Sequence, residues 1–228
     1  MSVFGESVRS ASVLNEEMLV MDPTIQMDYK LVFNKEIFVN FITDQDKKEN
    51  EEIVRFRIFI KGQPFQPDEV RLEMTMDTNV CLYLECTVNS NEFNKIKQEN
   101  NLRVEFSSFV PSIVDLLERS VKKSEDPKSE QYLVQFKQGQ DYGGTLIFLQ
   151  KLKLRIVKVF TLNFNVSPQD FIRNQVQYRF NKIKYEYTLK ETEINEHFRR
   201  ISDKNPSLAK QITNDVRKIL DKKYQKNF

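Results

Sequence analysis

The sequence predicts an α+β fold, in which a seven-stranded antiparallel β-sandwich or barrel with a two-helix insert is followed by C-terminal helices. Apolar and polar residues alternate in most segments of residues 28–166, which is typical of strands with one buried face. Short polar loops join these segments, as in antiparallel sheets. After residue 167, apolar residues recur every three or four positions, which indicates helices. We therefore divide the chain into a mobile leader at 1–27, a β-sandwich head domain at 28–166 and a C-terminal helical segment at 167–228.

Four strands are expected in the first half of the head. They cover Glu36–Ile42, Ile53–Ile60, Val70–Met76 and Val80–Val88. A charged loop at 44–52 separates the first two, and the cluster KGQPFQPDE, with two prolines and a glycine, separates the second and third. Because every connection is short and polar, neighbouring strands are expected to pair antiparallel.

Helical spacing interrupts the sheet pattern after residue 89. Ser90–Gln98 is predicted to be a helix with Ser90 as its N-cap, and Leu102–Phe106 alternates as a short strand would. A second helix is expected to start at Pro111, because proline is tolerated in the first turn of a helix. Gln131–Phe136 then returns to strand alternation, so the two helices form an insert in the sheet.

The twenty residues of Thr145–Phe164 have strand-like composition and contain no Gly, Pro or Asp. Strands average about five or six residues, so the run has room for two strands, although it lacks the usual turn residues. In its middle, three basic residues alternate with three apolar ones: Lys151, Lys153 and Arg155 with Leu152, Leu154 and Ile156. One interpretation is a hairpin whose projecting tip contacts another molecule. The other is one long strand with a solvated basic face.

Ser167 and Pro168 are predicted to start the first C-terminal helix, as its N-cap and its first residue. The apolar residues of this helix form a near-heptad stripe, which consists of Ile172, Val176, Phe180, Ile183, Tyr187, Ile194, Phe198 and Ile201. The sequence KNPS at 204–207 ends the stripe, and a last amphipathic helix follows. The stripe is either ordinary core folded back on the sheet or the seam of a short coiled-coil stalk. The stalk contacts would then be Ile183, Tyr187, Ile194, Phe198 and Ile201.

Composition leaves little room for catalysis or metal binding. His197, the only histidine, lies in a charged helical stretch, and Cys81 and Cys86 are too few for a Cys₄ zinc site. Neither GxxxxGK[ST] nor GxGxxG occurs, so the usual phosphate-binding loops are absent. We expect no enzyme, no catalytic, metal-ligating or cofactor-binding residues, and no small-molecule substrate.

Charge and hydropathy count against nucleic acid and membranes as partners. The net charge is +2, from 35 basic and 33 acidic residues, so nucleic acid is not an expected partner. No window approaches eighteen uncharged apolar residues, so no membrane span is expected. Two thiols that face opposite sides of a strand, together with the lack of an apolar leader peptide, favour a reducing cytoplasmic or nuclear interior.

Two stretches of the chain resemble a known family. EFNKIKQENNLRVEFSSFVPSIVDLLERS at Glu92–Ser120, followed by QYLVQF at Gln131–Phe136, is similar to the head domain of the centriolar cartwheel family, spindle assembly abnormal protein 6. The resemblance covers roughly Tyr29 to Phe180. It implies a seven-stranded β-sandwich head with a helical insert, running into a helical stalk. Heads of this family self-associate through a hydrophobic knob at a hairpin tip, and their stalks form parallel dimers.

The resemblance implies a particular interface at the hairpin tip. Alignment of TLNF with the family strand after the tip places the knob at Leu154, with Leu152 as the second choice, and the head–head interface at Leu152, Lys153, Leu154, Arg155 and Ile156. The family usually has Phe at the knob, so the knob is smaller here. The basic tip, with Lys158, would add attraction to an acidic partner. The short helical segment is most like a "6-like" branch that lacks the long coiled coil and occurs at basal bodies and in the apical complex of some parasites.

The expected function is therefore a self-associating structural scaffold of a centriole, basal body or apical microtubule-based structure, in the cytoplasm and cytoskeleton. Its expected partners are further copies of itself, as a homodimer or homo-oligomer, and centriolar or apical-complex proteins. An alternative keeps the head-and-stalk plan in a nuclear DNA end-joining scaffold, which would bind DNA in a salt-sensitive way. A small-ligand-binding β-barrel or a hydrolase is a third alternative, for which the sequence carries no motif.

Overall fold

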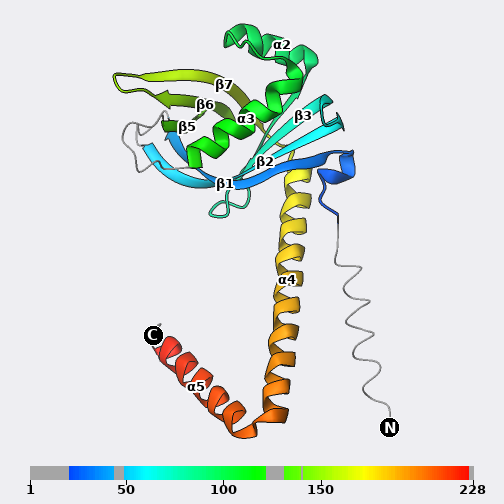
Figure 1. The fold of residues 1–228 in the computed structure, drawn as a ribbon, viewed down its shortest axis with the longest axis vertical. Helices are drawn as coiled ribbons and strands as arrows, with labels where there is room; N and C mark the ends of the chain where they lie inside the picture. The colour runs from blue at the N-terminus through cyan, green and yellow to red at the C-terminus, as the bar shows by residue number, and fades with distance from the viewer. Residues whose placement is uncertain (1–20, 44–48, 122–130, 140, 226–228) are drawn as a thin grey trace. The chain divides into compact units, whose positions relative to one another are not determined.

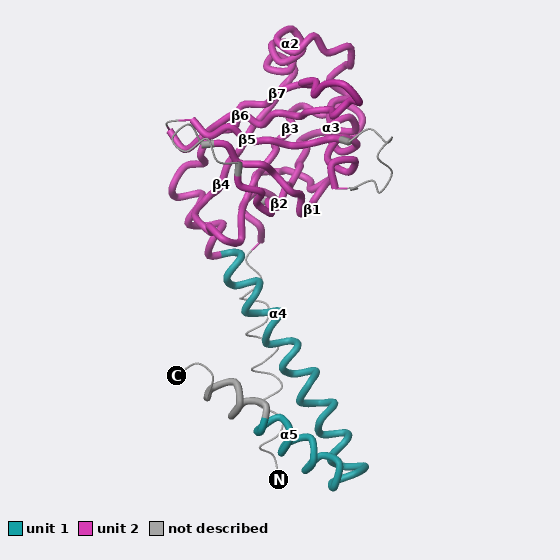
Figure 2. The backbone as a smooth tube through the Cα atoms, turned by 90° about the vertical axis from the view of Figure 1, so that its left-hand side faces the viewer, with its two compact units in different colours: residues 1–20, 178–228 teal, residues 21–177 magenta. Residues whose placement is uncertain are grey.

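The computed structural model describes residues 21–43, 49–121, 131–139 and 141–225. The chain divides into two compact units, of which one comprises residues 21–177 and the other residues 1–20 and 178–228 (Figure 2). Residues 21–27, which the sequence assigned to a mobile leader, belong to the first unit, where Asp22 and Thr24 are buried. The rest of the predicted leader, residues 1–20, lies outside the described residues.

Seven strands in the described chain form a closed barrel (Figure 1). In chain order they are β1 (Lys30–Thr43), β2 (Glu49–Gln63), β3 (Gln66–Thr75), β4 (Tyr83–Asn89), β5 (Gln131–Gln138), β6 (Gly144–Lys151) and β7 (Ile156–Val166). Around the barrel the order is β1-β2-β3-β4-β7-β6-β5. A short 3₁₀ helix, η1 (Ile25–Met27), precedes β1. The predicted α+β class and most of the predicted strand segments of this sheet are confirmed. The strand predicted at Val80–Val88 begins only at Tyr83, because residues 80–82 belong to the turn closed by the Leu82 N–H and the Asn79 carbonyl, so Cys81 does not share a strand with Cys86 as expected.

One strand pair departs from the antiparallel pattern expected from the sequence. Within the described residues, β1 and β5 pair parallel, with Asn40–Thr43 opposite Gln135–Gln138, whereas the other six pairs are antiparallel. The reason is topological, because strands whose directions alternate can close a ring only when their number is even. A barrel of seven strands must contain one parallel pair, and here it is the pair that closes the ring.

The insert between β4 and β5 contains two helices, α2 (Ser90–Glu99) and α3 (Phe106–Val121). The N-cap of α2 is Asn89, not Ser90 as predicted. The Asn89 side chain accepts hydrogen bonds from the backbone N–H groups of Asn91 and Glu92, at 2.9 and 3.0 Å. The Glu92 carboxylate accepts in return from the Asn89 N–H, at 2.9 Å, which completes a capping box.

The short strand predicted at Leu102–Phe106 is wrong, because residues 102–105 form no strand and Phe106 already begins α3. Leu102, Val104 and Phe106 are half-buried against the core, so their alternation reflects packing and not sheet pairing. Pro111 lies inside α3 and does not start it. The helix begins earlier than proline chemistry suggested, because Phe106 and Phe109 pack on the aromatic side chain of Phe93.

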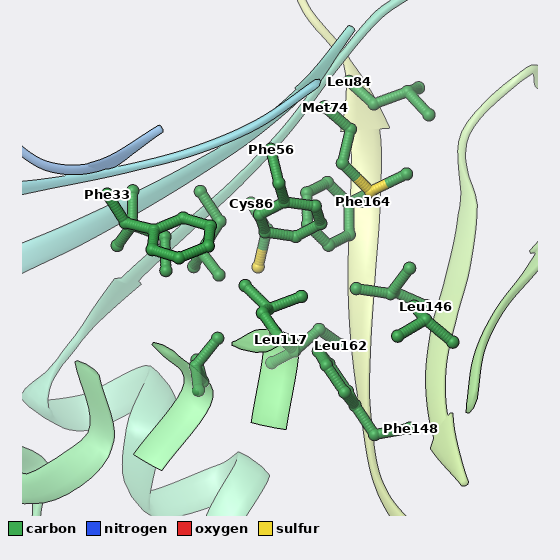
Figure 3. Packing of buried hydrophobic residues seen from close by; sticks show 14 of the residues in the cluster. Phe33, Phe56, Met74, Leu84, Cys86, Leu117, Leu146, Phe148, Leu162 and Phe164 are labelled. Atoms are coloured by element: carbon green, nitrogen blue, oxygen red, sulfur yellow. The ribbon is translucent and has the colours of Figure 1, made fainter. Parts of the chain in front are cut away.

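The barrel core is filled from both the strands and α3. Figure 3 shows Leu117 of α3 among strand residues that include Phe56, Phe148 and Phe164. Phe109, Ile113 and Leu117 of α3 are each at most 1% exposed. Burying three such side chains contributes about 1.5–3 kcal/mol each, so α3 is an integral part of the head and not an appendage.

Two helices follow the barrel, α4 (Gln169–Lys204) and α5 (Pro206–Gln225). The predicted break at residues 204–207 is confirmed, and the Asn205 side chain caps α5 by accepting from the Leu208 N–H at 3.1 Å. The predicted start of α4 at Ser167 and Pro168 is one residue too early, because the helix begins at Gln169 and the Pro168 carbonyl accepts its first helical bond from the Ile172 N–H. The Ser167 hydroxyl donates to Glu85. None of the described helices is both long and apolar enough to cross a membrane.

Candidate functional site

The Thr145–Phe164 run folds back on itself, so the interpretation as a single long strand is wrong. The last cross-strand pair of β6 and β7 is Lys151 with Ile156, and the four residues between them form the turn. The N–H of Leu152 donates to the carbonyl of Arg155 at 2.8 Å. None of the four turn residues is among the positive-φ residues of the described chain, so all four have negative φ. This turn therefore forms without the glycine or asparagine that tight two-residue hairpins require.

The turn carries its apolar side chain into solvent. Leu154 is 96% exposed and Ile156 57% exposed, whereas Leu152 is half-buried. Lys153 and Arg155 are also exposed, so the structure brings all five residues predicted for the interface to one hairpin tip. A single exposed Leu is ordinary on a protein surface. Here, however, Leu154 lies at the end of a projecting hairpin, and the conformation of the turn does not require a leucine at that position.

The tip is basic and lacks internal charge compensation. Lys151, Lys153, Arg155 and Lys158 are all exposed and lie within eight residues. In the described part of the chain, none of these four side chains has an ion-pair partner. A net charge of +2 for the whole protein thus conceals a local concentration of positive charge around Leu154.

The sequence pattern did not predict a second exposed hairpin tip, between β2 and β3. Gln63 pairs with Gln66 at the end of β2 and β3, and the two residues between them form the turn. Phe65 in this turn is 90% exposed. The sequence pattern identifies the segment only as a turn cluster of prolines and a glycine. The signal that could have revealed the tip is an aromatic residue inside that cluster.

The apolar stripe of α4 is exposed over most of its length. Ile183, Tyr187 and Ile194 are 66%, 69% and 66% exposed. Phe198 is 37% exposed, and Ile201 is half-buried near the start of α5. Within the unit of residues 178–228, these side chains are not packed as core. The predicted helix over these residues is confirmed, whereas the role of its stripe as a dimer seam stays a prediction.

A buried ionic cluster, which the sequence did not reveal, lies at the base of the barrel. Arg57 of β2 pairs with Asp22 at 2.5 Å and with Glu73 of β3 at 2.6 Å. Gln175 of α4 donates from its amide nitrogen to Asp22 Oδ1 and to Thr24 Oγ1, both at 3.0 Å. Glu73, Thr24 and Gln175 are fully buried. The cluster therefore fastens residues 22–24 and the start of α4 to two strands of the barrel.

Electrostatics in this cluster favour the charged form of the arginine. Burial alone would lower the pKa of Arg57, but the charges of Glu73 and Asp22 raise it above its ordinary value. Burial, reinforced by the charge of Glu73, raises the pKa of the Tyr83 hydroxyl, which accepts a hydrogen bond from Arg57 at 2.6 Å. The ring of Phe171 in α4 packs edge-on against Tyr83 at 5.5 Å. Polar and aromatic contacts thus hold the same end of α4.

No group of three or more His, Cys, Asp or Glu side chains among the described residues is placed to hold a metal ion. An open groove lies at the end of α2, and its lining is polar and basic. The lining residues are Asn94, Lys97, Gln98, Asn101, Leu102 and Arg103.

A protein family and a curated protein are similar to this chain in sequence. The family model described as "Centriolar protein SAS N-terminal domain" matches residues 31–164. The "Spindle assembly abnormal protein 6 homolog" of Danio rerio is 25% identical over 108 residues, which cover 46% of this chain. Those residues are 17% of the zebrafish protein, so the chain spans about a sixth of the length of the curated relative that it matches.

Solved structures with a similar fold come from several organisms. An N-terminal fragment of Leishmania SAS-6 that contains part of its coiled coil aligns with a TM-score of 0.62 at 15% identity, covering 76% of this chain and 99% of the fragment. An N-terminal fragment of a Drosophila melanogaster Sas-6 variant, dimerised via its coiled-coil domain, aligns with a TM-score of 0.58 at 14% identity and covers 92% of this chain and 99% of that one. The N-terminal domain of C. elegans SAS-6 gives a TM-score of 0.51 at 12% identity, covering 61% and 99%. At such identities the likeness concerns the fold alone.

Proposed function

The chain belongs to the centriolar protein SAS N-terminal domain family, and we propose that it is a non-enzymatic scaffold whose heads associate through the tip of the β6–β7 hairpin. The observation that carries the proposal is Leu154, which is 96% exposed at the end of that hairpin. Burial of this side chain against another head would remove the most exposed large apolar residue of the described chain from water.

The magnitudes require help from a second contact. Burying one Leu contributes about 1.5–3 kcal/mol, whereas association costs roughly 4–15 kcal/mol in lost translational and rotational freedom. Leu152 and Ile156 would widen the apolar contact, and backbone groups of the hairpin would add hydrogen bonds. Even so, heads that associate only through this tip would bind weakly.

We propose that the second contact is a parallel dimer of α4. Its seam would consist of Ile183, Tyr187, Ile194, Phe198 and Ile201, whose spacing is near-heptad. Lys190 and His197 fall on the same stripe and would weaken the dimer. A dimer that holds two heads near each other converts later head contacts into intramolecular or multivalent ones, which raises their effective concentration. Repetition of both contacts would build a higher-order scaffold.

Analytical ultracentrifugation of matched variants tests the tip. Leu154→Glu should shift the wild-type association equilibrium toward smaller species, because a carboxylate cannot be buried in an apolar site without a large cost. Leu154→Phe should strengthen association, since it enlarges the apolar area. Phe65→Glu, which changes an equally exposed hairpin tip, is the control and should leave association unchanged. If Leu154→Glu and wild type sediment alike at every concentration, the tip is not the contact.

The α4 contact is tested separately with Ile194→Glu. We expect this variant to lose the dimer while keeping the tip contact, and the double variant with Leu154→Glu to be monomeric. Circular dichroism should show little loss of helix, because Ile194 is 66% exposed in the single chain. A variant that stays dimeric would contradict the assignment of the seam.

Cellular location follows from the same proposal. We propose a centriole, a basal body or an apical microtubule-based structure as the site of action, with centriolar or apical-complex proteins as further partners. The family's description as centriolar supports the first of these. Fluorescence imaging of a tagged full-length chain should show discrete foci at one of these structures. Foci at sites of nuclear DNA damage would instead favour the DNA end-joining alternative.

A further inference from the structure

The β7 strand has one fully paired side and one largely unpaired side. It pairs with β6 from Ile156 to Phe164. On its other side it pairs with β4 only through Asn165 and Val166, opposite Glu85 and Leu84. Among the described residues, no strand therefore covers the outer side of β7 from its start to Phe164. Such a side presents a row of unpaired N–H and C=O groups, to which another chain can add as a strand.

Part of this side is already occupied from within the chain. Asn100, which follows α2, accepts from the N–H of Thr161 at 2.9 Å and from its hydroxyl at 3.1 Å. The same Asn100 side chain donates to the carbonyl of Ile96 at 3.0 Å, so it is held in place by its own helix. The insert thus caps the edge at Thr161. The segment left open is Ile156–Phe160, next to the hairpin tip.

The open segment is accessible. Figure 1 shows β7 along the outer side of the projecting β6–β7 hairpin, with α2 near the other end of the strand. Ile156 is 57% exposed, Lys158 is exposed, and Val157 and Val159 are half-buried. The register of β6 and β7 shifts between Phe148 and Leu149, so a bulge in β7 lies within this segment. A bulge increases local twist, which hinders flat pairing of two identical edges.

Charge determines which chain can use this edge. Arg155 and Lys158 lie at or beside the open segment, and Lys151 and Lys153 complete the uncompensated basic tip. Pairing of the edge with the same edge of a second copy would bring these cations together, and like charges on facing strands are destabilising. Lysines on an edge strand are a common protection against such pairing. An extended chain with acidic side chains would instead neutralise them.

We propose that the Ile156–Phe160 edge of β7 binds an extended acidic polypeptide segment, which adds to the barrel as a further strand. Backbone hydrogen bonds fix its register, Ile156 and the half-buried valines contact its apolar side chains, and the four cations pair with its carboxylates. At the Thr161 end, the strand would run toward the groove at the end of α2, which contains Arg103. The site shares Ile156 and the tip cations with the proposed head–head contact, but it does not require the Leu154 side chain.

Fluorescence anisotropy of the full chain tests the proposal. The probe is a labelled eight-residue peptide in which Glu alternates with Val and Thr. We expect saturable binding that weakens as NaCl rises from 50 to 500 mM. A second peptide of identical side chains carries N-methyl groups on alternate residues, which removes the hydrogen bonds of one edge and keeps the charge. It should bind about ten-fold or more weakly. Equal binding of the two peptides would overturn strand addition.

Two protein variants test the charge requirement. Arg155→Glu with Lys158→Glu should weaken the acidic peptide about ten-fold or more, because two cations that attract its carboxylates become anions that repel them. Lys182→Glu with Lys210→Glu, which makes the same charge change on exposed helical positions, should leave affinity within about two-fold. If both double variants lose affinity equally, the peptide responds to net charge alone and the edge assignment fails.

Hydrogen exchange locates the contact and separates it from head self-association. Addition of peptide should slow amide exchange at residues 156–160 and leave Leu162 unchanged, both in wild type and in Leu154→Ser. In Leu154→Ser, which lacks the proposed head contact, protection of residues 157–160 that follows protein concentration without peptide would mean that a second copy pairs with the edge, which would overturn the acidic-peptide assignment. If Leu154→Glu fails to alter self-association, only the proposed function falls, and the peptide result stands.

Discussion

Removal of the arginine from the buried ionic cluster should destabilise the head strongly. The Arg57 side chain is 11% exposed and faces two carboxylates, Asp22 at 6% and Glu73 at 0% exposed. In Arg57→Met, Glu73 keeps its bond to Arg71 at 2.8 Å, but Asp22 loses its cation. Breaking a buried ion pair from one side costs about 3–5 kcal/mol, because the remaining charge stays in a poorly solvated place.

The same strand provides a matched control. Arg55 lies two residues away, on the same face of β2, and pairs with Glu36 at 2.5 Å, but the two side chains are 42% and 52% exposed. Because exposed ion pairs contribute only about 0–1 kcal/mol, Arg55→Met should be nearly neutral. A difference of about 3 kcal/mol between the two variants would correspond to roughly 6–12 °C in Tm for a protein of this size.

Urea denaturation followed by circular dichroism measures both variants. The midpoint should fall for Arg57→Met with an unchanged slope, because the loss concerns stability and not the area exposed on unfolding. Addition of Asp22→Asn to Arg57→Met should recover part of the loss, since it removes the stranded charge. The reasoning would be refuted if Arg57→Met and Arg55→Met lost the same free energy of unfolding.

The remaining predictions concern single positions. Asn100→Ala should lower the free energy of unfolding by about 1–2 kcal/mol, because it leaves the Thr161 N–H without its acceptor, whereas Asn100→Asp should lose less in the same urea titration. Iodoacetamide should label only Cys81 in the native chain, because Cys86 is buried and burial raises the pKa of its thiol to about 12. Intact mass spectrometry should therefore show one label per chain, and two labels without denaturant would contradict the fold. The raised pKa also predicts stability that is complete below about pH 9 and lost as pH rises through about 12, and Cys86→Ala should flatten this decline in alkaline denaturation. Gly144→Ala should lower Tm, because a Cβ there would clash with the Lys137 carbonyl oxygen, and an unchanged Tm would show that β5 and β6 can separate locally.

Local sequence patterns were sufficient for most elements of the barrel. Alternation located the strands because each buries one face, and the length of Thr145–Phe164 implied a fold-back even without turn residues. The break between α4 and α5 followed from Asn205 and Pro206, which end and start helices by local chemistry. The pattern left a hairpin and one long strand open, and both the position of the tip at Leu154 and its role came from the family resemblance.

Errors arose where neighbouring residues compete or where packing decides. Asn89 and Ser90 are both good N-caps, and Asn89 is used because Glu92 stands three residues after it and completes the box. Leu102, Val104 and Phe106 alternate like a strand, yet they pack on the core without a partner strand. A hydrophobic pattern reports which side chains are buried, and it does not report what the backbone bonds to.

The sequence by itself determined the class of the fold and the spacing of the α4 stripe, because each depends on periodicity within a few residues. Only the tertiary structure decided which residues from distant segments bond to each other. The bond between Asp22 and Gln175 joins residues 153 positions apart, and Asn100 closes the β7 edge at Thr161 across 61 positions. Such pairings arise when the barrel closes, because side chains that are polar in the sequence are then buried and must find partners among whichever groups the fold brings to them.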